Sequence, residues 1–206
     1  MNLKNTGKKQ GMLPKKFFKD NIIDDLSPQM FTFFNAKMLA DPEGKKLLDS
    51  TQELLFDSER QKLINEERQY IEHLSNPQDI LRYMRKIKDA YNRCLLIEKV
   101  LAYQEDVIPL IISKLRTSGY DIFIEIAATA MLLTDEKYLH LLQEQFDEIR
   151  NPYARSEACL AFAREGKTEY TSFLLEQFNL LKKNYKTENY YNGPLIALSI
   201  IYINDR

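Results

Sequence analysis

The chain has 206 residues, of which 44% are hydrophobic and 29% charged, a balance typical of a folded protein and too apolar for a disordered one. Its 6 glycines and 7 prolines allow few tight turns, which disfavours an all-β fold. No apolar run approaches the roughly 20 residues needed to cross a bilayer, and the first residues lack the apolar stretch of a secretory signal, so we expect a cytoplasmic protein with no membrane partner.

The net charge of −1 is unevenly distributed along the chain. Residues 1–20 contain six lysines and one aspartate, which leaves a net charge of −6 on the other residues. We therefore predict a basic, flexible arm over residues 1–26, followed by a mildly acidic body. A solubilising tail is one interpretation, since chain termini are usually loose. Contact of the arm with a nucleic acid, a membrane or an acidic partner is the alternative.

Proline placement marks the starts of helices. Proline is favoured in the first helical turn, and a Ser, Asp or Asn before it accepts hydrogen bonds from the free amides of that turn. Five dipeptides of a capping-type residue and proline, four of them with Ser, Asp or Asn and one with Gly, precede apolar runs with helical spacing: Ser27-Pro28, Asp41-Pro42, Asn76-Pro77, Asn151-Pro152 and Gly193-Pro194.

The apolar spacing between these starts is helical and no segment shows sustained β alternation. The run over 77–103 reads either as two helices or as one bent helix. The predicted helices cover 27–40, 43–56, 58–75, 77–103, 105–117, 121–133, 136–150, 152–165, 168–183 and 194–203.

An internal repeat is visible in the second half of the chain. The tripeptide EQF occurs at 144–146 and again at 176–178, a spacing of 32 residues, and the apolar positions around it recur at spacings of 31 and 32. Leu115, Phe146 and Phe178 are equivalent in this frame. Alanine-rich segments around Ala127 and Ala158 repeat at a spacing of 31. Gly166 stands where the second of these segments has to end, as expected of a left-handed C-terminal residue.

These segments carry a resemblance to a known family. The stretch EDVIPLIISKL at 105–115 resembles the second helix of a HEAT repeat, and SEACLAFAREGK at 156–167 resembles the first. The resemblance implies an all-α fold, a short α-α superhelix over residues 77–206, with residues 27–76 as an N-terminal helical cap of the same domain. The period is short for the family and no Asp–Arg ladder recurs between units, so armadillo-like and other α-α superhelices remain alternatives.

Catalytic and metal-binding patterns are missing from the sequence. His73 and His140 fall in different helices, and no zinc-protease, nucleophile-elbow, P-loop or dinucleotide pattern is present. Two carboxylate pairs, Glu67 with Glu72 and Glu144 with Glu148, are more typical of solvated helix faces than of an active site. Cys94 and Cys159 lie in apolar stretches and are expected to be buried free thiols. We predict no cofactor and no metal.

The predicted function is that of a non-catalytic interaction or scaffold module. An outward row on the second helices would bind a neutral to basic protein or peptide through Glu136, His140, Glu144, Ser172 and Glu176.

Three further interpretations stay open. Some DNA-repair glycosylases use HEAT-like repeats, but the acidic body and the absence of tryptophan disfavour nucleic-acid binding. Self-association through the apolar last helix would make the chain a structural protein and a homo-oligomer. Tyr185, Tyr190 and Tyr191, before that helix, would either anchor an interface or cover the end of the core.

Overall fold

The computed structural model describes residues 42–43, 46, 58–185 and 190–204, and every regular element in these ranges is a helix. The predicted all-α class is therefore confirmed for this part of the chain. The basic arm over 1–26 and the predicted helix over 27–40 lie outside the described residues, as does most of the predicted helix over 43–56. None of the described helices is long and apolar enough to span a membrane.

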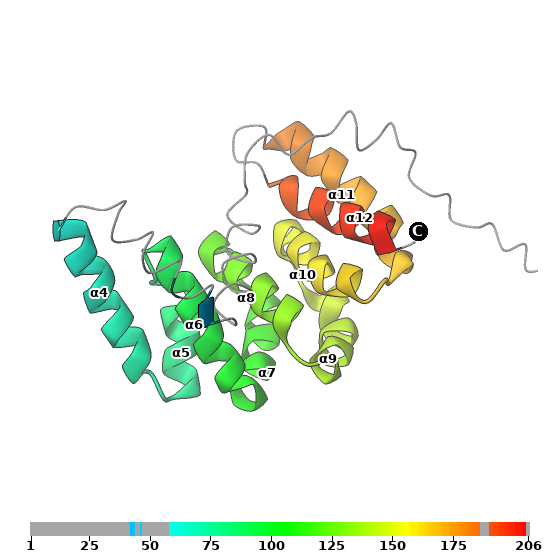
Figure 1. Cartoon of the computed structure of the whole chain (residues 1–206). Coiled ribbons are helices and arrows are strands. Elements are labelled where there is room, and N and C mark those ends of the chain that lie inside the picture. Colours follow the sequence, from blue (N-terminus) through cyan, green and yellow to red (C-terminus); the bar gives the residue numbers. More distant parts are fainter. Residues whose placement is uncertain (1–41, 44–45, 47–57, 186–189, 205–206) are drawn as a thin grey trace, which may run out of the picture.

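The helices follow one another with short connections (Figure 1). The predicted helices at 58–75, 105–117, 121–133 and 152–165 are confirmed to within two residues at each end. In chain order the elements are α4 (Ser58–His73), α5 (Pro77–Tyr83), α6 (Ala90–Ala102), α7 (Gln104–Leu115), α8 (Asp121–Leu133), α9 (Lys137–Gln145), the 3-10 helix η1 (Phe146–Glu148), α10 (Pro152–Arg164), the 3-10 helix η2 (Thr168–Tyr170), α11 (Thr171–Asn184) and α12 (Asn192–Asn204).

Two of the predicted caps are present where the structure describes them. The Asn76 side chain accepts hydrogen bonds from the amides of Gln78 and Asp79, and the Asn151 side chain accepts one from the amide of Tyr153. α10 ends at Arg164 and is closed by Gly166, whose φ is 67°: the amides of Gly166 and Lys167 donate to the carbonyls of Ala163 and Phe162. This closure satisfies two of the free carbonyls at the helix end.

Other boundaries differ from the predicted ones. The run over 77–103 is two helices, separated at residues 84–89. α12 begins at Asn192, two residues before Pro194, because proline is tolerated throughout the first helical turn, where its missing N–H has no intrahelical partner. The predicted helices over 136–150 and 168–183 each include a 3-10 turn, at η1 and η2.

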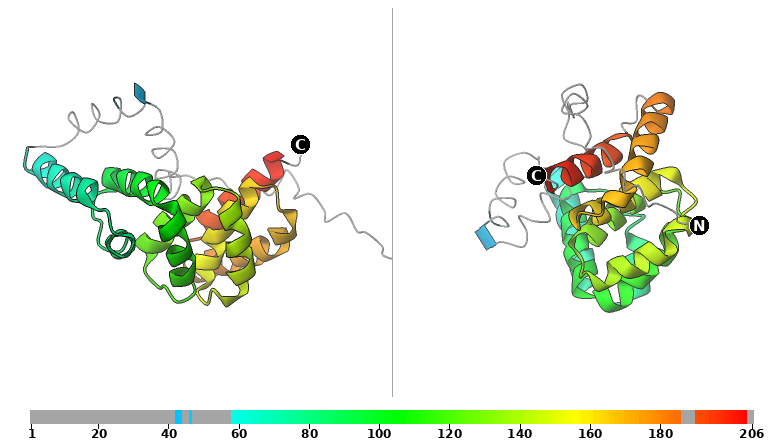
Figure 2. Two further views of the ribbon diagram at one scale, coloured as in Figure 1. Left: turned by 90° about the horizontal axis from the view of Figure 1, so that it is seen from below. Right: turned by 90° about the vertical axis from the view of Figure 1, so that its right-hand side faces the viewer.

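The helices are arranged in two layers (Figures 1 and 2). In one layer α4, α6, α8, α10 and α12 lie side by side in chain order, because each packs against the next even-numbered helix. In the other layer α5 packs against α7, and α7 against α9. α11 packs mainly against α12 and α10 and makes little direct contact with α9. The second layer is therefore interrupted between α9 and α11.

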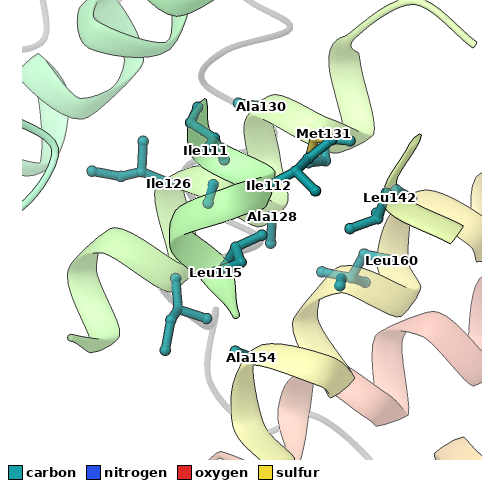
Figure 3. Packing of buried hydrophobic residues seen from close by; sticks show 14 of the residues in the cluster. Ile111, Ile112, Leu115, Ile126, Ala128, Ala130, Met131, Leu142, Ala154 and Leu160 are labelled. Atoms are coloured by element: carbon teal, nitrogen blue, oxygen red, sulfur yellow. The ribbon is translucent and has the colours of Figure 1, made fainter. Parts of the chain in front are cut away.

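One hydrophobic core runs through the described array, from Ile71 of α4 to Ile201 of α12. α8 and α10 are buried on all sides and carry the small residues of the repeat, so their neighbours approach closely. Figure 3 shows Leu115 of α7, Met131 of α8 and Leu160 of α10 within this core. Leu115, Phe146 and Phe178, equivalent in the sequence frame, are all buried.

Polar contacts link neighbouring units at a nearly constant sequence spacing. Ion pairs join residues 32 positions apart in three places, and a fourth contact joins the guanidinium of Arg164 to the carbonyl of Leu132, also 32 positions away. The sequence shows no Asp–Arg ladder because the residue types change from unit to unit while the spacing does not. The three ion pairs are Arg93–Glu125, Arg116–Glu148 and Lys137–Glu105.

Candidate functional site

The first part of the predicted acidic row lies on α9. Glu136 immediately precedes the helix, and His140 and Glu144 follow at successive intervals of four residues. Residues four apart lie on the same face of a helix, and all three side chains are exposed. We call these three residues the α9 patch.

The second part of the row lies on α11. Ser172 and Glu176 are exposed and are also four residues apart, and we call them the α11 patch. The two patches do not form one continuous row along adjacent helices, because α9 and α11 make little direct contact. Between the end of α9 and the start of α11, the ring of Phe146 packs against Tyr170 and Phe173 at centroid distances of 5.2 and 5.6 Å.

In the described part of the chain, the carboxylates of both patches are not in ion pairs, whereas some of the acidic residues near them are. Glu136, Glu144 and Glu176 form no ion pair with any residue that the structure describes. By contrast, Glu105 binds Lys137 at 2.5 Å and Glu148 binds Arg116 at 2.7 Å. The first of these bonds lowers the pKa of Glu105 and raises the pKa of Lys137. The patches thus keep negative charge that no described cation neutralises.

A second group of carboxylates is buried between α6, α8 and α10. Glu125 accepts a hydrogen bond from the Arg93 guanidinium at 3.1 Å and one from the Tyr153 hydroxyl at 3.4 Å. Glu157, one turn after Tyr153, is 0% exposed. Burial, reinforced by the charge of Glu125, raises the pKa of Glu157 well above its usual range, and burial also raises the pKa of Glu125, against the effect of Arg93.

This buried group is closed to a substrate in the described conformation. Glu157 has no surface, and its carboxyl group lies directly against Gly193 in the first turn of α12. Glu157 was not among the functional residues predicted from the sequence. A glutamate directly before the small and apolar segment at 158–163 was the available signal, and it follows Glu125 by 32 residues, one more than the spacing of the two alanine-rich segments. We interpret it as a packing residue of the α10–α12 junction.

Two of the three tyrosines before α12, Tyr190 and Tyr191, cover the end of the core, which was one of the two interpretations. The Tyr190 hydroxyl donates to Asp121 at 2.5 Å, and its ring packs on Tyr153 with the centroids 4.6 Å apart. Tyr191 packs edge-on against Phe178. Tyr185 contacts Tyr190 but remains exposed.

The two carboxylate pairs considered from the sequence do not form dyads. Both oxygens of Glu67 accept hydrogen bonds from the amides of Lys88 and Asp89, just before α6, and Glu148 is paired with Arg116. Among the described residues no group of three or more His, Cys, Asp or Glu side chains is arranged to hold a metal ion.

The two cysteines, Cys94 and Cys159, are buried and free, as predicted. Burial raises the pKa of Cys94 to about 12, so its thiol stays protonated and unreactive at neutral pH.

Comparison with known proteins gave no match: no protein-family model, no curated protein and no solved structure is significantly similar to this chain. The resemblance to HEAT repeats therefore rests on the residues and the spacing described above.

Proposed function

We propose that this chain is a non-catalytic interaction module built as a short HEAT-like α-α superhelix, and that it binds a neutral to basic protein segment through the α9 and α11 patches. The observation that carries the proposal is the set of exposed carboxylates, Glu136, Glu144 and Glu176, that no described cation neutralises. A cytoplasmic location is part of the same proposal.

Two features of the fold support the superhelical part. Even-numbered helices pack against one another in chain order, and polar links recur at a spacing of 32 residues. Stacked helix pairs of this kind expose the second helices of successive units as an extended surface, which repeat proteins use for binding.

Electrostatics would act mainly on encounter with the partner. Each exposed ion pair is worth only about 0.2–1 kcal/mol, so three carboxylates steer a basic segment and set its orientation more than they determine its affinity. The association rate should therefore fall as ionic strength rises, since the Debye length shortens from about 10 Å at 0.1 M salt to about 3 Å at 1 M.

The test is a selection of displayed random peptides on the immobilised chain at low salt, followed by affinity measurements with the selected peptides. We expect the peptides to be net positive, and we expect Glu144→Lys and Glu176→Lys to weaken their binding by about three- to fivefold each. Glu72→Lys is the matched control: Glu72 is exposed on α4 and the substitution changes the net charge equally.

The result also separates the two patches. Loss of binding in Glu144→Lys alone would assign the site to α9, and loss in Glu176→Lys alone would assign it to α11. Peptides whose binding is unchanged by both substitutions would contradict the proposal. Tight binding of an oligonucleotide by the chain, or a sedimentation coefficient that rises with concentration, would favour the nucleic-acid or the self-association alternative.

A further inference from the structure

A groove of about 550 Å³ lies at the opposite end of the array from α12, between α4 and the connection from α5 to α6. Its walls combine apolar, acidic and basic side chains from segments 60–67 and 83–89. The lining residues are Arg60, Leu63, Ile64, Glu66, Glu67, Tyr83, Lys86, Lys88 and Asp89.

The acidic side chains of this groove are already engaged. Oε1 of Glu67 accepts hydrogen bonds from the Tyr83 hydroxyl at 3.1 Å and the Lys88 amide at 2.9 Å. Its Oε2 accepts from the amide of Asp89 and the side chain of Asn92, so this carboxylate caps the start of α6.

The other two acidic groups are also paired. Asp89 is buried, pairs with Arg60 at 3.5 Å and accepts a hydrogen bond from the Asn92 amide. Glu66 pairs with Lys62. All three carboxylates that line the groove therefore have cationic or N–H partners within the chain.

The lysines of the groove remain available. Lys86 and Lys88 are exposed, and neither is in an ion pair with a residue that the structure describes. Ile87 between them is buried and fixes the connection to the core. The two ammonium groups form no ion pair with the carboxylates of the groove, and they give this edge a local positive charge next to Glu67, which is held by neutral donors and keeps its negative charge.

An apolar surface adjoins this edge. Leu63 is 61% exposed and Tyr70 is 53% exposed, and residues seven apart lie on one face of α4. The Tyr70 ring packs on the Tyr83 ring with the centroids 4.7 Å apart, which holds Tyr70 beside the groove. Exposed large apolar side chains next to fixed charges are typical of surfaces that bind amphipathic segments.

We propose that this groove binds a short acidic, amphipathic segment of a partner protein, with its apolar side chains on Leu63 and Tyr70 and its carboxylates at Lys86 and Lys88. A nucleic acid is disfavoured because the site offers two available lysines and an apolar face, not an extended basic surface. The inference goes beyond the proposed function, since the partner has the opposite charge and the site lies on different helices from α9 and α11.

The probe is a fluorescein-labelled helix-forming peptide with glutamate at its polar positions and leucine at its apolar positions, followed by fluorescence anisotropy. We expect saturable binding that the double substitution Lys86→Glu and Lys88→Glu weakens by about tenfold, and that Leu63→Ser weakens by about three- to tenfold. The control pair Lys114→Glu and Lys183→Glu, on α7 and α11, changes the net charge equally and should leave binding within about twofold of the unsubstituted chain.

Lys86, Lys88 and Leu63 are exposed, so we expect each variant to fold. Circular dichroism would verify this. The proposal is overturned by unchanged binding in the Lys86/Lys88 variant, by an equal loss in the control pair, or by a single-stranded oligonucleotide that binds with the same lysine dependence. Glu144→Lys with Glu176→Lys should not weaken binding of the acidic peptide, so failure of this proposal and failure of the proposed function are distinguishable.

Discussion

Glu157 is a fully buried carboxyl group at the junction of α10 and α12. The titratable groups near it include Glu125 and Tyr153, and Glu125 forms an ion pair with Arg93. Moving an ionised carboxylate into such a site is costly, so the protonated form is favoured in the folded chain. Stability should therefore depend on the pH through this residue.

The raised pKa of Glu157 sets the direction of that dependence. Its stabilising effect is fully present below the unfolded-state pKa, near 4.5, and is lost as the pH rises through the folded-state pKa. We expect Glu157→Gln to be more stable than the unsubstituted chain at neutral pH. Its free energy of unfolding should also decrease less as the pH rises. Urea unfolding followed by circular dichroism, from about pH 4 to pH 8, measures both. A variant that is less stable at neutral pH would show that the charged form stabilises the fold.

Gly193 is required by the same junction. A Cβ atom at this position would lie 1.8 Å from Oε1 of Glu157, well inside contact distance. We expect Gly193→Ala to lower the free energy of unfolding by about 1–3 kcal/mol, the usual cost of overpacking. Gly119→Ala is the matched control, because no atom lies within 4 Å of the added methyl group there. Equal effects of the two substitutions on thermal unfolding would contradict this packing.

At the scale of the helices, Arg164 links two units. Its guanidinium, at the end of α10, donates to the carbonyls of Leu132 and Thr134 at the C-terminal end of α8. These carbonyls have no intrahelical partner, and a cation is favoured beside them.

We expect Arg164→Met to lower the free energy of unfolding by about 1.5–3 kcal/mol, as for other hydrogen bonds to charged groups. Arg150→Met, at an exposed arginine whose side chain forms no ion pair with a described residue, should change it by less than about 0.5 kcal/mol. Urea denaturation of both variants checks the difference, and a neutral Arg164→Met would show that the link contributes nothing to stability.

The helix boundaries show what local sequence can predict. Asn76 and Asn151 cap helices through bonds to residues two and three positions away, so the Asn-Pro pattern was sufficient to predict them. The break between α5 and α6 could not be predicted in the same way. The conformation of this connection depends on Glu67, whose carboxylate accepts hydrogen bonds from the amides of Lys88 and Asp89. These residues follow Glu67 by 21 and 22 positions.

At the scale of the whole molecule, the candidate site was only partly predictable. The exposure of Glu136, His140 and Glu144 follows from the helical spacing. Their separation from Ser172 and Glu176 does not, because it depends on how α11 turns onto α12 and α10. The groove at Lys86 and Lys88 was missed because its positive edge appears only once the neighbouring carboxylates are seen to be paired.

The helix pairs share one continuous core, which extends from α4 to α12 in the described chain. Native-state hydrogen exchange of the unsubstituted chain and of Gly193→Ala tests this continuity most directly. If the core is continuous, the slowest amides of α7, α8 and α10 open with one common free energy, and the substitution lowers it equally in all three. Loss of protection in α10 and α12 alone, with α7 and α8 unchanged, would show two separate cores and contradict a single continuous one.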